Sequence, residues 1–291
     1  MTETDCWAEW LATRRYGGDA ELRKKFVGQV GQFRDQVLDN AALAEGETLL
    51  DVGCGEGLIG FGALERGAGS VVFSDVSQDL LNLCREAANA LGVVDRCRFV
   101  LSPADDLSQV ASESVDVVAT RSVLIYVDDK RRAFEEFFRV LRPGGRISLF
   151  EPINRFGYPE PPGRFAGYDF TRIPEIADKL RAVYDELQPP ETDPMLNFDE
   201  RDLVHDCTAA GFFPVRLRLK AELTPHEPRP WQTFLNVAWN PKVPTLAEAV
   251  EQVLSPSERE LLTRELRPQV ETGTGVSRLA HAWLSATKPA G

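Results

Sequence analysis

The chain has 291 residues, of which 43% are hydrophobic, so it is long and apolar enough for a globular body with one large core and insertions. Its 33 Lys and Arg against 45 Asp and Glu give a formal net charge of −12, and an acidic surface repels phosphate backbones, which argues against nucleic acid and favours a small molecule as partner. No stretch approaches a membrane span, and the first ten residues lack the basic start and apolar stretch of a secretory signal, so we expect a cytoplasmic protein without a membrane partner.

The N-terminal segment has a helical pattern from Asp5 to Asn40. We predict a helical cap over residues 1–45, followed by a main domain over residues 46–291. The alternatives for the cap are helices that pack on the sheet and helices that reach a ligand. Its apolar and aromatic markers are Trp7, Trp10, Leu11, Tyr16, Phe26, Val30 and Phe33.

The most informative motif is LLDVGCGEG at residues 49–57. A short apolar run delivers Asp51 into a loop with glycine at every second position, and a helix expected over residues 58–65 directs its N-terminal amides to the same place. The pattern indicates a nucleotide-like cofactor, whereas a glycine triplet alone would also fit a simple tight turn. The glycines are Gly53, Gly55 and Gly57.

Strands and helices alternate through the next hundred residues. A strand at 71–75 ends in Asp75, about one β–α–β step after Asp51, where an acid can hold a ribose diol. The alternation predicts an α/β fold with a parallel sheet flanked on both sides. The further elements expected are helices at 79–91 and 131–141, a stop at Pro143–Gly145, and strands at 98–102, 115–120 and 146–150, the last ending at Glu151.

Two insertions follow the fifth and sixth strands. Residues 152–199 are rich in Pro, Gly and aromatics and should hang over the strand ends, which predicts a lid, with an irregular packed loop as the alternative. Residues 225–275 are expected to be a helical insertion. Between them we expect a helix at 200–210 and a strand at 212–223, whereas periodicity does not decide between strand and helix for residues 276–288.

From about Thr48 to Glu151 the chain resembles the class I, seven-stranded, S-adenosylmethionine-dependent methyltransferases. The resemblance rests on DVGCGEG, on the acid of FSDVS, on ADDL at 104–107, on TRSVLIYVDD and on VLRPGGRISLFEP. It implies a Rossmann-like seven-stranded sheet with residues 276–288 as the seventh, antiparallel strand, and S-adenosylmethionine as cofactor.

The resemblance also assigns residues to the cofactor. The backbone of the glycine loop would lie along the methionine part, Asp75 would bridge the ribose hydroxyls, and Asp105 would accept a hydrogen bond from the adenine amino group. Thr120 and Arg121 would cap the methionyl end, while Arg15 and Tyr16 of the cap could reach its carboxylate or the substrate. The candidate cofactor-binding residues are Tyr16, Asp51, Gly53, Cys54, Gly55, Gly57, Asp75, Val76, Ala104, Asp105, Thr120 and Arg121.

The five cysteines are odd in number and scattered, which favours reduced thiols and gives no zinc or other metal site by spacing. Some methyltransferases of arsenic compounds use cysteine trios, and that assignment is a remote alternative here. The cysteines are Cys6, Cys54, Cys84, Cys97 and Cys207.

Charge separates this class from nicotinamide oxidoreductases. S-Adenosylmethionine presents a sulfonium, an ammonium and hydroxyls, which suit acids, whereas a pyrophosphate would be repelled by Asp51 and Glu56. The spacing is also GxGxG rather than GxGxxG. An NAD(P)-dependent oxidoreductase is therefore the less favoured alternative, beside a protein that binds the cofactor without methyl transfer.

Methyl transfer needs alignment and exclusion of water, plus a base where the acceptor is a hydroxyl or acidic carbon. Glu151 ends the fifth strand, Tyr126 follows the fourth strand where relatives often have histidine, and His226 lies in a proline-flanked loop. These are the catalytic candidates, with a structural carboxylate, packing and a surface histidine as their alternatives. We expect a methyltransferase that acts on a small-molecule O, N or C nucleophile in specialised metabolism; the sequence does not indicate its oligomeric state.

Overall fold

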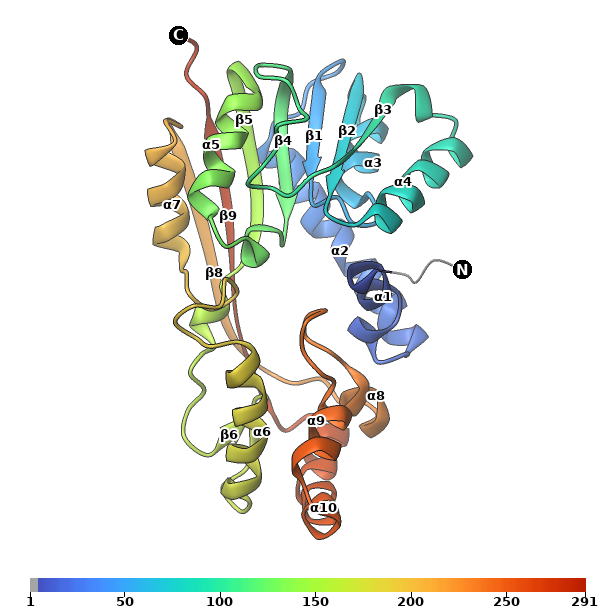
Figure 1. Cartoon of the computed structure of the whole chain (residues 1–291), viewed down its shortest axis with the longest axis vertical. Coiled ribbons are helices and arrows are strands. Elements are labelled where there is room, and N and C mark those ends of the chain that lie inside the picture. Colours follow the sequence, from blue (N-terminus) through green and yellow to red (C-terminus); the bar gives the residue numbers. More distant parts are fainter. Residues whose placement is uncertain (1–4) are drawn as a thin grey trace.

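The computed structural model describes residues 5–291, so Met1–Thr4 at the start of the predicted cap lie outside the described residues. A seven-stranded sheet carries helices on both faces, and a second group of helices lies beyond one end of its strands (Figure 1). The predicted α/β class and Rossmann-like seven-stranded sheet are confirmed.

The sheet has the order β3-β2-β1-β4-β5-β9-β8. Strands β1 to β5 are parallel, and β9 runs antiparallel to both neighbours. Periodicity left the last segment undecided, and pairing on both sides makes it a strand. The bounds are β1 Thr48–Val52, β2 Ser70–Asp75, β3 Cys97–Leu101, β4 Val115–Arg121, β5 Leu141–Pro152, β8 Val215–Pro225 and β9 Val276–Thr287.

Strand β5 begins five residues earlier than the sequence predicts. Its register on β4 shifts, because Leu141 pairs with Val115 and Arg146 pairs with Val117. The Pro143–Gly145 stretch therefore forms an irregularity inside the strand, with Gly144 at φ +80°, rather than a helix stop outside it.

Helices α2, α3 and α4 cover one face of the sheet, and α5 and α7 cover the other. Side-chain caps fix several starts: Ser77 accepts from the Leu80 N–H in α4, and Asp129 accepts from the Arg132 N–H in α5. The bounds are α2 Ala20–Asn40, α3 Leu58–Glu65, α4 Gln78–Ala90, α5 Lys130–Val140 and α7 Glu200–Ala209, with short 3-10 turns η2 Val94–Arg96, η3 Leu124–Tyr126 and η4 Asn154–Phe156.

The two insertions, residues 152–199 and 225–275, pack against each other into a separate hydrophobic core, and we call them the insertion body. Phe170, Leu180 and Leu266 are fully buried there. The insertion body lies beyond the carboxyl ends of the parallel strands, where the lid was expected (Figure 1). Its elements are the two-residue strands β6 Arg164–Phe165 and β7 Tyr168–Asp169, and helices α6 Pro174–Leu187, α8 Trp231–Asn236, α9 Leu246–Val253 and α10 Pro256–Thr272.

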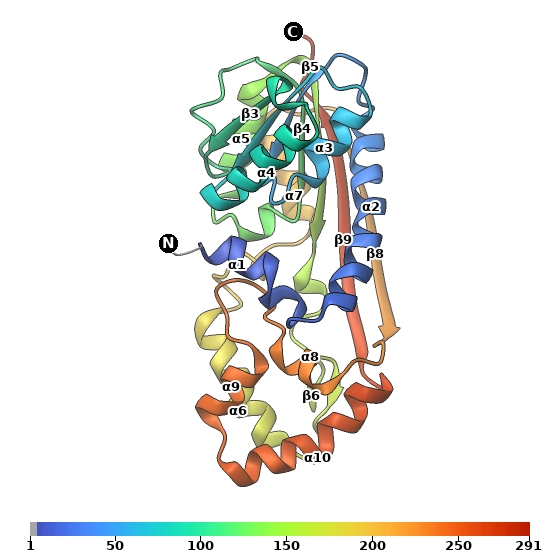
Figure 2. The same ribbon diagram turned by 90° about the vertical axis from the view of Figure 1, so that its right-hand side faces the viewer.

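The first two elements, α1 Cys6–Ala12 and η1 Arg14–Tyr16, lie between the sheet and the insertion body (Figure 2). On the sheet side, the Asp5 carboxylate accepts a hydrogen bond from Ser77 Oγ at 2.6 Å. On the other side, Trp10 Nε1 donates to the Ala238 carbonyl at 2.9 Å and Arg14 pairs with Glu248 at 2.7 Å. This segment therefore bridges both parts. Within the described residues, no helix is long and apolar enough to cross a membrane.

Candidate functional site

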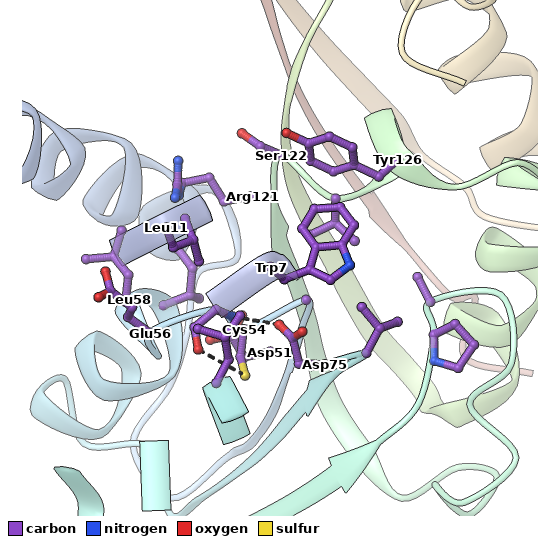
Figure 3. A pocket seen from close by; sticks show the side chains of 18 of the residues that line it. Trp7, Leu11, Asp51, Cys54, Glu56, Leu58, Asp75, Arg121, Ser122 and Tyr126 are labelled. Atoms are coloured by element: carbon purple, nitrogen blue, oxygen red, sulfur yellow. Dashed lines mark hydrogen bonds between the residues drawn. The ribbon is translucent and has the colours of Figure 1, made fainter. Parts of the chain in front are cut away.

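A cavity of about 490 Å³ opens at the carboxyl ends of β1, β2 and β4 and is covered by α1 and η1 (Figure 3). Its size is in the range of small-molecule and cofactor sites. Most of the cofactor-binding residues expected from the sequence lie on its wall. They are Tyr16, Asp51, Gly53, Cys54, Gly55, Asp75, Val76, Ala104, Asp105 and Arg121, together with the catalytic candidate Tyr126.

The glycines of the loop have different functions. All three have positive φ, which favours glycine. A Cβ on Gly53 would lie 2.4 Å from Val123 Cγ2, and one on Gly57 would lie 2.4 Å from Phe61 Cε2, so protein atoms exclude a side chain there. At Gly55 the nearest atom is Leu11 Cδ1 at 3.7 Å, and a side chain would enter the cavity. Gly55 thus leaves room for a ligand, whereas Gly57 caps α3 and does not line the wall.

Asp75 holds the glycine loop against the end of β2. Its Oδ2 accepts from the Gly55 N–H at 2.8 Å and its Oδ1 accepts from the Ser77 N–H at 2.9 Å. Each oxygen keeps a second acceptor direction, so the carboxylate can also receive hydrogen bonds from a diol. Burial raises the pKa of Asp75 above its ordinary value.

Asp51 lies deeper, beneath the loop, and is only 1% exposed. Its Oδ2 accepts from the Gly60 N–H of α3 at 2.8 Å. Burial, reinforced by the charge of Asp75, raises the pKa of Asp51 to about 7. A cationic ligand group beside it would favour the ionised form.

Two arginines, Arg15 and Arg121, also line the cavity and lie close enough to interact electrostatically. Burial and the charge of Arg15 lower the pKa of Arg121 to about 10, so it remains a cation at neutral pH. The Arg15 guanidinium lies over the Trp10 ring at 4.9 Å and the Tyr16 ring at 5.8 Å. This pair of cations suits a carboxylate, and Tyr16 lines the same cavity.

Trp7 and Tyr126 form an aromatic wall on which their rings meet edge to face at 5.0 Å (Figure 3). Burial raises the pKa of Tyr126 to about 12, so its hydroxyl is a neutral donor rather than a base at physiological pH. The sequence pattern predicts a helix around Trp7 but does not assign this residue to the site. A tryptophan in a segment that is expected near a ligand does, however, indicate a ligand contact. Other lining residues outside the predicted set include Leu11, Val30, Ser122, Val123 and Asp128.

Glu151 is fully buried and does not line the cavity. Its Oε1 accepts from Thr120 Oγ1 at 3.2 Å and from the N–H groups of Val123 and Leu124 at 3.0 Å, and its Oε2 accepts from the Ile125 N–H at 3.1 Å. The carboxylate therefore fixes the loop that carries Ser122 and Tyr126. Glu151, the candidate base, and Thr120 therefore lie behind the cavity wall. Their hydrogen bonds are made to each other and, from Glu151, to the backbone of this loop.

His226 lies in the insertion body, away from the cavity wall. Its ring stacks on Tyr168 at 4.9 Å between Gly167 and Gly275, and its Nε2 is 3.3 Å from the Ala166 carbonyl oxygen. Burial lowers its pKa, so the ring is neutral. The turn after β8 directs this histidine into packing and not toward the other candidates.

The donor set fits S-adenosylmethionine. Asp75 and Asp105 are acids suited to the diol and the adenine amino group, and both line the cavity. Asp51 and Arg121, which line the same cavity and interact electrostatically, suit the ammonium and the carboxylate that the methionyl α-carbon carries together. Gly55 leaves the space that a side chain would fill. In the region that the structure covers, no three His, Cys, Asp or Glu side chains form a metal-binding group.

Comparison with known proteins agrees with this geometry. Residues 50–149 match the family described as "Methyltransferase domain". The chain is 36% identical over 122 residues to an arsenite methyltransferase of Halobacterium salinarum, covering 41% of this chain and 31% of that protein. It is 36% identical over 101 residues to the tRNA 5-carboxymethoxyuridine methyltransferase of Escherichia coli K12, covering 35% of this chain and 38% of the relative.

A longer match is to the ubiquinone/menaquinone biosynthesis C-methyltransferase UbiE of Klebsiella pneumoniae, 29% identical over 180 residues, 60% of this chain and 70% of the relative. Among solved structures, geranyl diphosphate C-methyltransferase of Streptomyces coelicolor A3(2), in complex with Mg²⁺, geranyl diphosphate and S-adenosyl-L-homocysteine, has the same fold, with a TM-score of 0.53, 17% identity, and coverage of 95% and 88% of the two chains.

The chain therefore carries a class I methyltransferase domain, and the cofactor of this class is S-adenosylmethionine. The matches to the first two relatives cover about a third of their lengths. The family model covers residues 50–149 and so includes neither the cap nor the insertion body.

The pKa of Asp51 predicts how cofactor binding depends on pH. The ligand-free carboxyl holds its proton up to about pH 7, whereas the ammonium group, which S-adenosylmethionine and S-adenosylhomocysteine both carry, favours the carboxylate, so binding releases a proton below that pH. We expect the affinity for S-adenosylhomocysteine to rise with pH up to about 7 and then level, and Asp51→Asn to flatten this profile. Calorimetry in buffers of different ionisation enthalpy measures the released proton, and a wild-type profile without slope would contradict the assignment.

Proposed function

We propose that this protein transfers the methyl group of S-adenosylmethionine to an oxygen, nitrogen or carbon nucleophile of a small molecule. The observation that carries the proposal is one cavity whose wall combines acids, arginines and an aromatic pair formed by Trp7 and Tyr126. The bound cofactor supplies an activated methyl group, and the protein has to hold the acceptor in line and exclude water.

The cap and the insertion body support a small acceptor. The segment formed by α1 and η1 covers the cavity and is bonded to the insertion body through Trp10 and Arg14, which restricts access by a large polymer. The net charge of −12 also disfavours nucleic acid. UbiE and geranyl diphosphate C-methyltransferase, which share this fold, are small-molecule precedents, whereas the tRNA methyltransferase makes nucleic acid the competing class.

Arsenite is a poor candidate for the acceptor. Cys54 Sγ lies 4.0 Å from Cys84 Sγ beneath the glycine loop, and within the described residues no third cysteine joins them in a metal-binding group. Burial and the Cys84 thiol raise the pKa of Cys54 well above its usual value, so it stays a thiol. We place the acceptor in specialised metabolism, an assignment that rests on the large aromatic insertion body.

Tyr126 is proposed as the group that orients the acceptor, and Glu151 as the residue that positions its loop. Tyr126→Phe keeps the ring against Trp7 and removes only the hydroxyl. We expect cofactor affinity to stay within about twofold and turnover to fall by about 5- to 13-fold, the effect of losing one hydrogen bond of about 1–1.5 kcal/mol.

The test uses methyl-labelled cofactor with a panel of phenols, amines, isoprenoid carbon nucleophiles, arsenite and bulk tRNA. Labelled small-molecule product together with equimolar S-adenosylhomocysteine supports the proposal. Label in tRNA, methylated arsenic, or acceptor conversion without S-adenosylhomocysteine would each replace it with a different function. Equal turnover by Tyr126→Phe and wild type would remove Tyr126 from the acceptor site.

A further inference from the structure

Strand β8 is an exposed edge of the sheet. It is the last strand in the order and pairs only with β9 along the whole length from Val215 to Pro225. Every residue from Arg218 to Pro225 is exposed. Figure 2 shows this strand along one margin of the molecule. Long exposed edges are templates for pairing with another strand.

The register determines which backbone groups face the open side. The His226 N–H donates to the Gly275 carbonyl at 2.9 Å, one step beyond the Pro225–Val276 pair. In an antiparallel ladder alternate residues face the partner, so the even-numbered residues of β8 bond to β9. The N–H and C=O groups of Leu219, Ala221 and Leu223 therefore point outward, where no further strand of the described chain pairs with them.

Side chains along this edge are sorted by face. Leu219 is 41% exposed and Leu223 is 58% exposed on one face, with the exposed Ala221 between them. Lys220 and Glu222 lie on the opposite face and form an ion pair at 2.8 Å with both side chains exposed. An apolar stripe on one face and a pair of opposite charges on the other are the features of a strand that can pair with its own copy.

We propose that β8 pairs antiparallel with β8 of a second copy of this chain, with Ala221 on the two-fold axis. This register sets Leu219 against Leu223 of the other copy, and Lys220 against its Glu222. Each apolar contact and each ion pair then occurs twice, as a two-fold interface requires. The outward N–H and C=O groups of Leu219, Ala221 and Leu223 bond across the interface.

The neighbouring registers place like charges opposite each other across the interface. An axis on Lys220 sets Lys220 against itself, an axis on Leu219 sets Arg218 against Lys220, and an axis on Glu222 sets Glu222 against itself. Like charges directly opposite each other destabilise strand pairs. Of these four registers, only the one centred on Ala221 sets opposite charges against each other without any pair of like charges. Lys220 and Glu222 therefore favour this register over the other three.

The experiment measures mass and sedimentation of the full chain across the micromolar range. Wild type is expected to show a concentration-dependent dimer, and Ala221→Pro a monomer, since proline removes an outward N–H and leaves the bonds to β9. Leu91→Lys, which changes an exposed leucine on another surface, is the control and should remain dimeric. Wild type that stays monomeric, or dimers indifferent to Ala221→Pro, would overturn the proposal.

A charge exchange tests the register without touching the backbone. Lys220→Glu and Glu222→Lys each place like charges opposite one another, and we expect each to raise the dimer dissociation constant by about tenfold. The double variant restores opposite charges and should restore wild-type dimerisation. In the register centred on Lys220 the double variant would stay impaired, which would reject the assignment. Circular dichroism confirms that each monomer is folded.

Discussion

Replacing Glu151 with alanine is expected to lower the free energy of unfolding by about 3–5 kcal/mol, a loss typical of a broken buried hydrogen-bond network. The carboxylate accepts from Thr120 and from three consecutive backbone N–H groups, Val123 to Ile125. Its removal leaves those buried donors without a partner. Urea denaturation, followed by tryptophan fluorescence and by circular dichroism, measures the loss.

The conservative variant Glu151→Gln separates anchoring from acid–base chemistry. Its carbonyl oxygen can replace Oε1, but its amino group then faces the Ile125 N–H, so we expect a loss of about 1–2 kcal/mol. Turnover should fall without a change in the shape of the pH–rate profile. Glu86→Gln, an exposed position on α4, is the matched control. Full stability combined with abolished turnover and a lost basic limb would instead show that Glu151 is the base.

Replacing Asp75 with alanine is expected to weaken binding of S-adenosylhomocysteine by about 1–3 kcal/mol, or about 5- to 150-fold in Kd. The variant loses a carboxylate placed for the ribose diol and also releases the Gly55 and Ser77 N–H groups, which it holds in the ligand-free protein. Isothermal calorimetry measures the change.

Two comparisons identify the source of that loss. Asp95→Ala, an exposed acid on η2, should leave Kd unchanged. Binding of 5′-methylthioadenosine, which keeps the ribose and lacks the amino-acid part, should weaken as much as binding of S-adenosylhomocysteine. A loss confined to S-adenosylhomocysteine would move Asp75 from the ribose to the methionyl end.

The sheet could be predicted because its signals are local. Apolar runs that end in Asp51 and Asp75, followed by amphipathic helices, specify parallel strands and their order of appearance along the chain. The last strand could not be assigned by periodicity, since pairing with both β5 and β8 decides it. The irregularity near Gly144 was missed for the same reason, because a register shift is a property of two strands.

That most of the proposed cofactor-binding residues line one cavity could be predicted, because one loop and the strand ends next to it supply them. The acceptor end comes from separate segments, so Trp7 had no sequence partner that would identify it, although its ring meets Tyr126. Glu151 and His226 show the converse limit. Both residue types suit acid–base chemistry. Only the fold shows that the Glu151 carboxylate accepts hydrogen bonds from backbone N–H groups and that the His226 ring packs against Tyr168.

The bridging of α1 to both parts of the molecule has a kinetic consequence. Ser77 holds its first turn to the sheet, and Ala238, far away in sequence, holds Trp10 near its last turn. A ligand that leaves the cavity past this segment must first loosen one side of the bridge, either the Asp5–Ser77 contact or the contacts of Trp10 and Arg14 with the insertion body. Replacement of S-adenosylhomocysteine by S-adenosylmethionine is therefore expected to depend on fluctuations of the segment between α8 and α9. Substitutions in that segment would change the residence time of the bound cofactor without contacting it.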